Sequence, residues 1–170
     1  MSDVARLAAV CDELLEQARD LVLKLDGEDF TSTLPGVGSS AGAHLRHCLD
    51  AFDCLLDGHD GGRVDYDRRA RDRRTETEPI AALERIETLR ARLRDELAIT
   101  SDRSLAVRAD EPGLAPQDGW VRSTLARELR ALASHTTHHY ALVAIVLRLR
   151  GVAIPERFGV APSTWAHARR

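Results

Sequence analysis

Aromatic residues are scarce in this chain, whose 170 residues include two Trp, two Tyr and three Phe, 4% in all. A core with few large rings has to be built from Leu, Ala, Val and Ile, which favours packed helices over a β-sandwich. Neither sign of charge predominates, because the chain has 24 basic and 27 acidic residues and a net charge of -3. This balance gives no indication of nucleic acid, a membrane surface or an acidic partner. The 44% hydrophobic fraction is typical of a globular protein.

Long apolar runs and paired cysteines are missing as well. The chain contains no run of about 18 apolar residues, so we expect no transmembrane helix. Its amphipathic N-terminus does not resemble a signal peptide. The three cysteines, Cys11, Cys48 and Cys54, have no CxxC spacing, which favours buried free thiols in a reducing compartment. We therefore expect a cytoplasmic protein without membrane contact. The length predicts a single domain over residues 1–170.

Apolar residues recur at helical spacing in four segments of the chain. The predicted helices span residues 3–25, 40–57, 78–98 and 124–150, where Ser39 or Ser40 caps the second and Ser123 or Thr124 caps the fourth. Long connections cover residues 58–77 and 99–120, and the second contains a short extended piece at 104–108. Residues 155–170 form an extended tail, whose aromatic side chains we expect to pack on the helices. These elements predict an all-α four-helix bundle with long crossover loops rather than simple up-down-up-down topology.

Five of the seven histidines fall in two of these helices. His135 and His139 are four residues apart, which places both on the core-facing side of the last helix. Burying two unpaired imidazoles costs free energy, and a metal ion would satisfy both. A third ligand would come from the second helix, where the helical wheel does not choose between His44 and His47. The alternative is a set of buried histidines that only form hydrogen bonds.

Two motifs carry a resemblance to a known family. The second helix begins Ser40-Ala41-Gly42-Ala43-His44-Leu45-Arg46-His47, and the last helix has His135 and His139 followed by an apolar run and Gly151. This pattern resembles the DinB/YfiT-like superfamily of metal-binding helical bundles. The resemblance implies a four-helix bundle in which His47, His135 and His139 bind one divalent ion: zinc, nickel or iron. His44, His138 and the tail depart from the family's pattern.

The resemblance implies several activities rather than one. Some members of the superfamily transfer low-molecular-weight thiols, some isomerise a thiol adduct, and a related domain supplies iron ligands in sulfoxide synthases. One hypothesis is a metal-dependent enzyme of thiol-transferase or hydrolase type, acting on a small thiol or an anionic small molecule. The alternative is a non-catalytic metal-binding or stress-related module with a structural ion. The catalytic residues are unknown.

Several side chains are candidates for supporting roles around the histidines. His44, His138 and Glu128 are candidate proton carriers, and Glu128 could equally pair with an arginine. Asp50 could orient the ring of His47. Arg46, or one of the arginines at 68–74, could hold an anionic substrate, although the interleaved charges of residues 65–74 favour a solvated loop. Two apolar stripes on the second helix and a fourth helix that is apolar almost all round at 141–147 predict a homodimer through helix packing.

Overall fold

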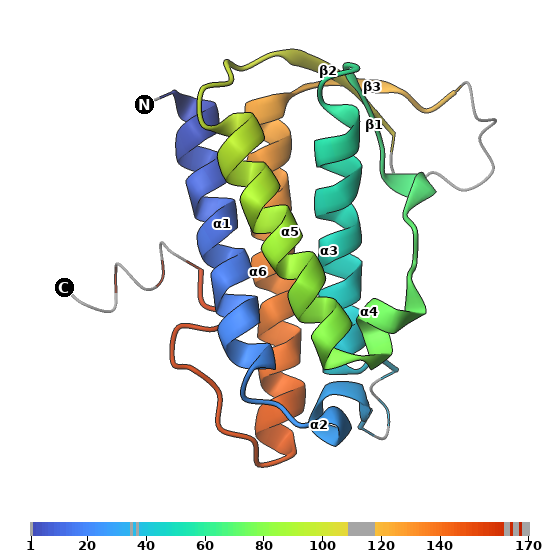
Figure 1. Cartoon of the computed structure of the whole chain (residues 1–170), viewed down its shortest axis with the longest axis vertical. Coiled ribbons are helices and arrows are strands. Elements are labelled where there is room, and N and C mark those ends of the chain that lie inside the picture. The colour runs from blue at the N-terminus through green and yellow to red at the C-terminus, as the bar shows by residue number, and fades with distance from the viewer. Residues whose placement is uncertain are drawn as a thin grey trace.

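Four long helices make up most of the molecule. The computed structural model describes residues 2–34, 36, 38–108, 118–161, 164 and 167. The long helices are α1 (Asp3–Val22), α3 (Ala41–Gly58), α5 (Pro79–Leu97) and α6 (Leu125–Leu149). They lie side by side, and α1 and α3 each pack against both α5 and α6 (Figure 1). The four helical segments predicted from the sequence are confirmed, with the largest shift in bounds at the end of α1.

The connections contain more regular structure than the sequence predicted. They form the short helices α2 (Gly27–Thr31) and α4 (Arg73–Thr77), a 3-10 turn at Tyr66–Arg68, and the strands β1 (Arg63–Asp65), β2 (Ser104–Arg108) and β3 (Val121–Thr124). The strands form one sheet, in which β2 pairs parallel to β1 and antiparallel to β3. The mostly helical fold and the extended piece predicted at 104–108, which is β2, are confirmed, whereas the sequence does not indicate the other two strands or the short helices. β1 and β3, with three and four residues, are too short for apolar alternation to reveal them.

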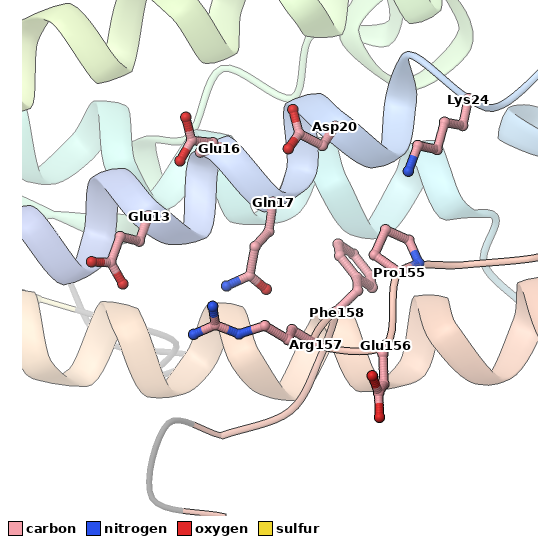
Figure 2. A pocket seen from close by; sticks show the side chains of 9 residues that line it. All are labelled: Glu13, Glu16, Gln17, Asp20, Lys24, Pro155, Glu156, Arg157 and Phe158. Atoms are coloured by element: carbon pink, nitrogen blue, oxygen red, sulfur yellow. The ribbon is translucent and has the colours of Figure 1, made fainter. Parts of the chain in front are cut away.

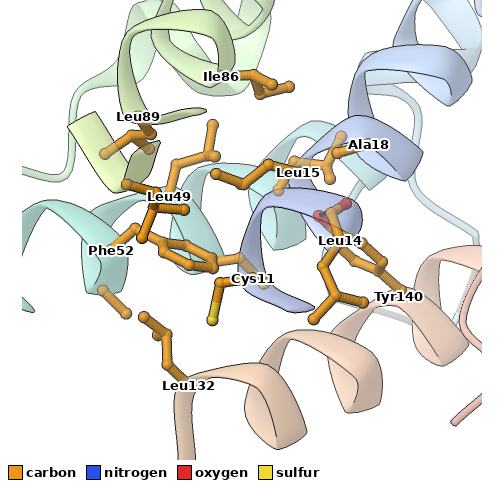
Figure 3. Close-up of a cluster of buried hydrophobic side chains, with 14 of the residues drawn as sticks. Cys11, Leu14, Leu15, Ala18, Leu49, Phe52, Ile86, Leu89, Leu132 and Tyr140 are labelled. Atoms are coloured by element: carbon orange, nitrogen blue, oxygen red, sulfur yellow. Dashed lines mark hydrogen bonds between the residues drawn. The ribbon is translucent and has the colours of Figure 1, made fainter. Parts of the chain in front are cut away.

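The core between the long helices is made mainly of aliphatic side chains, as the scarcity of aromatic residues requires. Leucines from α1, α3, α5 and α6 meet there with Phe52 and Tyr140 (Figure 3). The Tyr140 hydroxyl is buried and donates to the Leu14 carbonyl oxygen at 3.1 Å. Within the described residues, no helix is long and apolar enough to cross a membrane.

The cysteines behave as small core residues. All three are free thiols; Cys11 and Cys48 are buried and Cys54 is half-buried. Burial raises the pKa of Cys11 and of Cys48 to about 12 and is the main cause that raises the pKa of Cys54 to about 11. Since the thiolate is the reactive form, these side chains are inert near neutral pH.

The described part of the tail packs on the helices as predicted. The Phe158 ring stacks on Tyr140 with centroids 4.6 Å apart and an interplanar angle of 12°. Gly159 follows with φ +73, and a Cβ at this position would lie 2.7 Å from the Ala141 backbone nitrogen. The tail therefore runs against α6 closely enough to require glycine there. Trp165, the other predicted contact, lies outside the described residues.

The start of α3 explains why its sequence carries both serine and glycine. The Ser40 hydroxyl oxygen accepts a hydrogen bond from the Ala43 amide at 3.1 Å and so caps the helix. Gly42 faces α4 and α2, where an added Cβ would lie 2.1 Å from the Glu76 carbonyl oxygen and 2.6 Å from Cε1 of Phe30. The two short helices approach α3 at this point because no side chain intervenes.

Gly42→Ala is therefore expected to destabilise the protein by about 2 kcal/mol, because the clash with the Glu76 backbone outweighs the better helix propensity of alanine. The measurement is urea denaturation followed by far-ultraviolet circular dichroism. Gly27→Ala is the matched control, since a Cβ on Gly27 meets nothing within 4 Å. Equal unfolding midpoints for the two variants would contradict the packing described for α3.

Candidate metal centre

Helices α3 and α6 bring three histidines into one cluster. One nitrogen from each of His47, His135 and His139 lies within 4.8 Å of the other two. Nε2 of His47 and Nε2 of His135 are 2.9 Å apart, and the ring of His139 lies 4.6 and 4.5 Å from those two rings by centroid distance. The structure thus selects His47 for this cluster, a choice that the helical wheel had left open.

The spacing of these nitrogens suits one metal ion. Three imidazole nitrogens bound tetrahedrally at about 2.0–2.1 Å would lie roughly 3.3 Å from one another. In the cluster, the distances between these nitrogens run from 2.9 Å to at most 4.8 Å, a range that includes the roughly 3.3 Å expected around an ion. Small side-chain movements are enough to place them around an ion, so the residues present fit a divalent metal.

The surroundings keep the imidazoles of His47 and His139 neutral, which is the form that binds metals. Burial, followed by the charge of Arg69, lowers the pKa of His47 to about 4. Burial, followed by the neighbouring His47 and His135, lowers the pKa of His139 to about 3. Both rings therefore offer unprotonated nitrogen throughout the neutral pH range.

The outer nitrogens of two of these rings have partners of their own. Nδ1 of His139 lies 2.9 Å from Nδ1 of His44, one turn before His47 on α3. Nδ1 of His47 accepts from the Arg69 guanidinium at 3.4 Å. Because both Nδ1 atoms face these partners, Nε2 is the nitrogen that His47 and His139 offer to the centre of the cluster.

The remaining histidines lie outside this cluster. His138 is exposed, and its ring centroid is 5.5 Å from that of His139. His59 is buried at the far end of α3, where its Nε2 lies 3.2 Å from a carboxylate oxygen of Glu96. His59 therefore belongs to the packing of α3 on α5.

Glu128 is buried, but its hydrogen bonds tie the small sheet to α6. Its carboxylate accepts from the Tyr66 hydroxyl at 3.1 Å, from the Ser123 hydroxyl and from Arg127 at 2.9 Å. The arginine partner that the sequence allows for Glu128 is confirmed as Arg127, whereas no sequence pattern indicates Tyr66. Tyr66 lies 62 residues away, in a connection without periodic pattern, so no local signal could have identified it.

Asp50 also has a structural role. Its carboxylate accepts from Arg46 at 3.0 Å and from Arg85 at 2.8 Å, so two guanidinium groups hold it between α3 and α5. Arg46 donates further to Glu76 at 3.2 Å. Asp50 acts on His47 only through its charge, which raises the pKa of that ring against the larger lowering effects.

Among the arginines considered for anion binding, Arg69 lies closest to the cluster. Arg46 is held by two carboxylates, and Arg74 pairs with Glu78 at 3.2 Å. Arg69 follows the 3-10 turn, and its guanidinium lies within hydrogen-bond distance of Nδ1 of His47. The connection predicted as a solvated loop thus supplies a cation beside the three histidines.

The cluster is reachable from solvent. His47, His135 and His139 are all partly exposed, and the described part of the tail packs against Tyr140 and beside α1. A hollow of about 670 Å³ lies between α1 and the tail and is lined mostly by charged side chains, none of them from the histidine cluster (Figure 2). Among the described residues, neither the segment 152–161 nor the lining of this hollow includes a residue of the histidine cluster.

Comparison with known proteins identifies the family. A sequence model of the DinB superfamily matches residues 4–143, which include α1 through most of α6 and the three clustered histidines. The chain belongs to the DinB superfamily. It is also similar to the FK506-binding protein 5 of Rhizopus delemar, with 30% identity over 107 residues, which are 63% of this chain and 28% of that protein. This DinB chain thus spans little more than a quarter of that relative, and no solved structure matches it.

Proposed function

We propose that this DinB protein is a four-helix bundle of the DinB/YfiT-like type that holds one divalent ion, zinc, nickel or iron, with His47, His135 and His139. We propose further that it is a metal-dependent enzyme of thiol-transferase or hydrolase type. The observation that carries the proposal is the convergence of three imidazoles at a partly exposed position between α3 and α6. Three neutral ligands leave the ion its full charge and leave coordination positions open.

A bound divalent ion would act as a Lewis acid and lower the pKa of a water or thiol that reaches it. The protein's own groups fix the geometry of that site. α3 and α6 hold the three ligand rings, and burial keeps the imidazoles of His47 and His139 neutral by lowering their pKa. His138, exposed beside His139, is the candidate proton carrier open to solvent, whereas Glu128 is committed to Tyr66 and Ser123.

Arg69 is the proposed partner for an anionic substrate. His47 can bind a metal through Nε2 only with its proton on Nδ1, and a protonated Nδ1 cannot accept from Arg69. The guanidinium lies beside the cluster, so its charge would attract a carboxylate or thiolate that approaches the ion. A small thiol or another anionic small molecule is accordingly the proposed substrate class.

The alternative function, a non-catalytic or stress-related module with a structural ion, requires a closed site with a fourth protein ligand. The partial exposure of all three histidines favours the open site. Titration of the cobalt(II)-loaded protein with small thiols separates the two. An open site is expected to give a thiolate-to-metal charge-transfer band, followed by turnover when an electrophile is added. A spectrum that neither thiols nor small anions change would establish the closed, structural site instead.

A further inference from the structure

The contact between His44 and His139 extends the proposed metal site beyond its three ligands. We propose that His44 is a positioning residue, which accepts a hydrogen bond from Nδ1–H of His139 and so fixes the ring with Nε2 towards the metal. The proposal rests on the metal site described above. It assigns a role to a histidine that lies outside the three-ligand set and departs from the family's motif.

The geometry places His44 on the ligand rather than on the ion. Its Nδ1 lies 2.9 Å from Nδ1 of His139, and the two ring centroids are 5.2 Å apart. His44 precedes His47 by three residues, so both project from one side of α3 towards α6. One turn of α3 therefore supplies a ligand, His47, and the hydrogen-bond partner of another ligand, His139.

The chemistry of imidazole explains why such a partner matters. A neutral ring carries one proton, and coordination through Nε2 requires that proton to be on Nδ1. A hydrogen-bond acceptor at Nδ1 fixes both the tautomer and the orientation of the ring, a role usually taken by a carboxylate, a backbone carbonyl or water. His44 can fill it when its own proton is on Nε2.

A neutral partner also has a consequence for the ion. A carboxylate at this position would add negative charge and make the His139 ring more basic, which would reduce the net positive charge of the centre. An imidazole orients His139 without adding charge. His44 therefore preserves a strongly electrophilic centre, as expected where a water or thiol must be deprotonated.

Two substitutions of similar size separate the hydrogen bond from packing. In His44→Asn the side-chain oxygen takes the place of Nδ1 and can accept from His139, whereas His44→Leu fills similar space without an acceptor. Zinc affinity is measured by competition with a chromogenic chelator. His44→Leu is expected to bind zinc about 10–100-fold more weakly than the unsubstituted protein, and His44→Asn within about threefold of it. His138→Ala, which removes the exposed neighbour, should leave the affinity unchanged.

Nitrogen-15 NMR of the zinc-loaded proteins gives a second readout. The Nδ1–H signal of His139 should be protected from solvent exchange in the unsubstituted protein and in His44→Asn, and should be lost or exchange-broadened in His44→Leu. If His44→Leu does not fold, His44→Asn decides alone: retained affinity and a protected signal support the proposal, and their loss overturns it.

The outcomes also separate this inference from the metal site itself. An unsubstituted protein that binds no metal would overturn both proposals. Metal binding with equal affinity in His44→Leu would overturn only the role of His44. Equal weakening in His44→Leu and His44→Asn would show that ring volume matters rather than the hydrogen bond, and would overturn the role as well.

Discussion

His139→Ala is expected to reduce the metal content from about one ion per chain to less than roughly a tenth of that after dialysis, since two imidazoles cannot hold a divalent ion as three do. All three rings contact one another, and His139 also lies against His44, so its loss removes both a ligand and the contact of α3 with that ligand. The measurement is elemental analysis of protein purified without a nickel column. Circular dichroism verifies that the variant is folded.

His138→Ala is the matched control for this prediction. It removes the same type of side chain from the adjacent position on α6, but His138 is exposed and outside the cluster. The control should keep its metal. A folded His139→Ala protein that retains the metal content of His138→Ala would contradict the assignment of the ligands.

Asp50→Ala is expected to lower the free energy of unfolding by about 3 kcal/mol, because it leaves two guanidinium groups without their shared carboxylate. The Asp50 carboxylate is 1% exposed and accepts from Arg46 at 3.0 Å and from Arg85 at 2.8 Å. Both arginine side chains are themselves mostly buried, at 19% and 16% exposure. Urea denaturation monitored by circular dichroism measures the change.

Asp57→Ala provides the comparison for Asp50→Ala. Asp57 is on the same helix and pairs with Arg92 at 2.8 Å, but its side chain is 70% exposed. An exposed ion pair of this kind contributes less than about 1 kcal/mol. If both variants lost the same free energy of unfolding, burial would not be the reason that Asp50 stabilises the protein.

The sequence was sufficient to predict the long helices because their signals are local. Apolar residues at helical spacing marked each one. The sequence offered two candidate caps for each of α3 and α6, and the structure selects Ser40 and Thr124, whose side chains accept hydrogen bonds from the first turns of the helices. The pair His135 and His139 followed from spacing alone. The third histidine, His47, followed only from the resemblance to the DinB family.

The remaining features depend on contacts between distant segments. Residues 63–65 become a strand only because residues 104–108 pair with them in parallel, and three residues are too few to show a pattern of their own. In the same way, the approach of His44 to His139 joins residues 95 positions apart. The contact between His44 and His139 depends on how α3 packs on α6. A helical wheel drawn for either helix alone gives no information on that packing.

The central claim is that three histidines hold one metal ion at an open site between α3 and α6. A crystal structure of the metal-loaded protein, with anomalous scattering recorded at the absorption edge of the ion, tests it most directly. We predict one anomalous peak about 2.0–2.2 Å from Nε2 of His47, His135 and His139, with water or substrate in the remaining positions. No peak there, or a peak held by other side chains, would contradict the account.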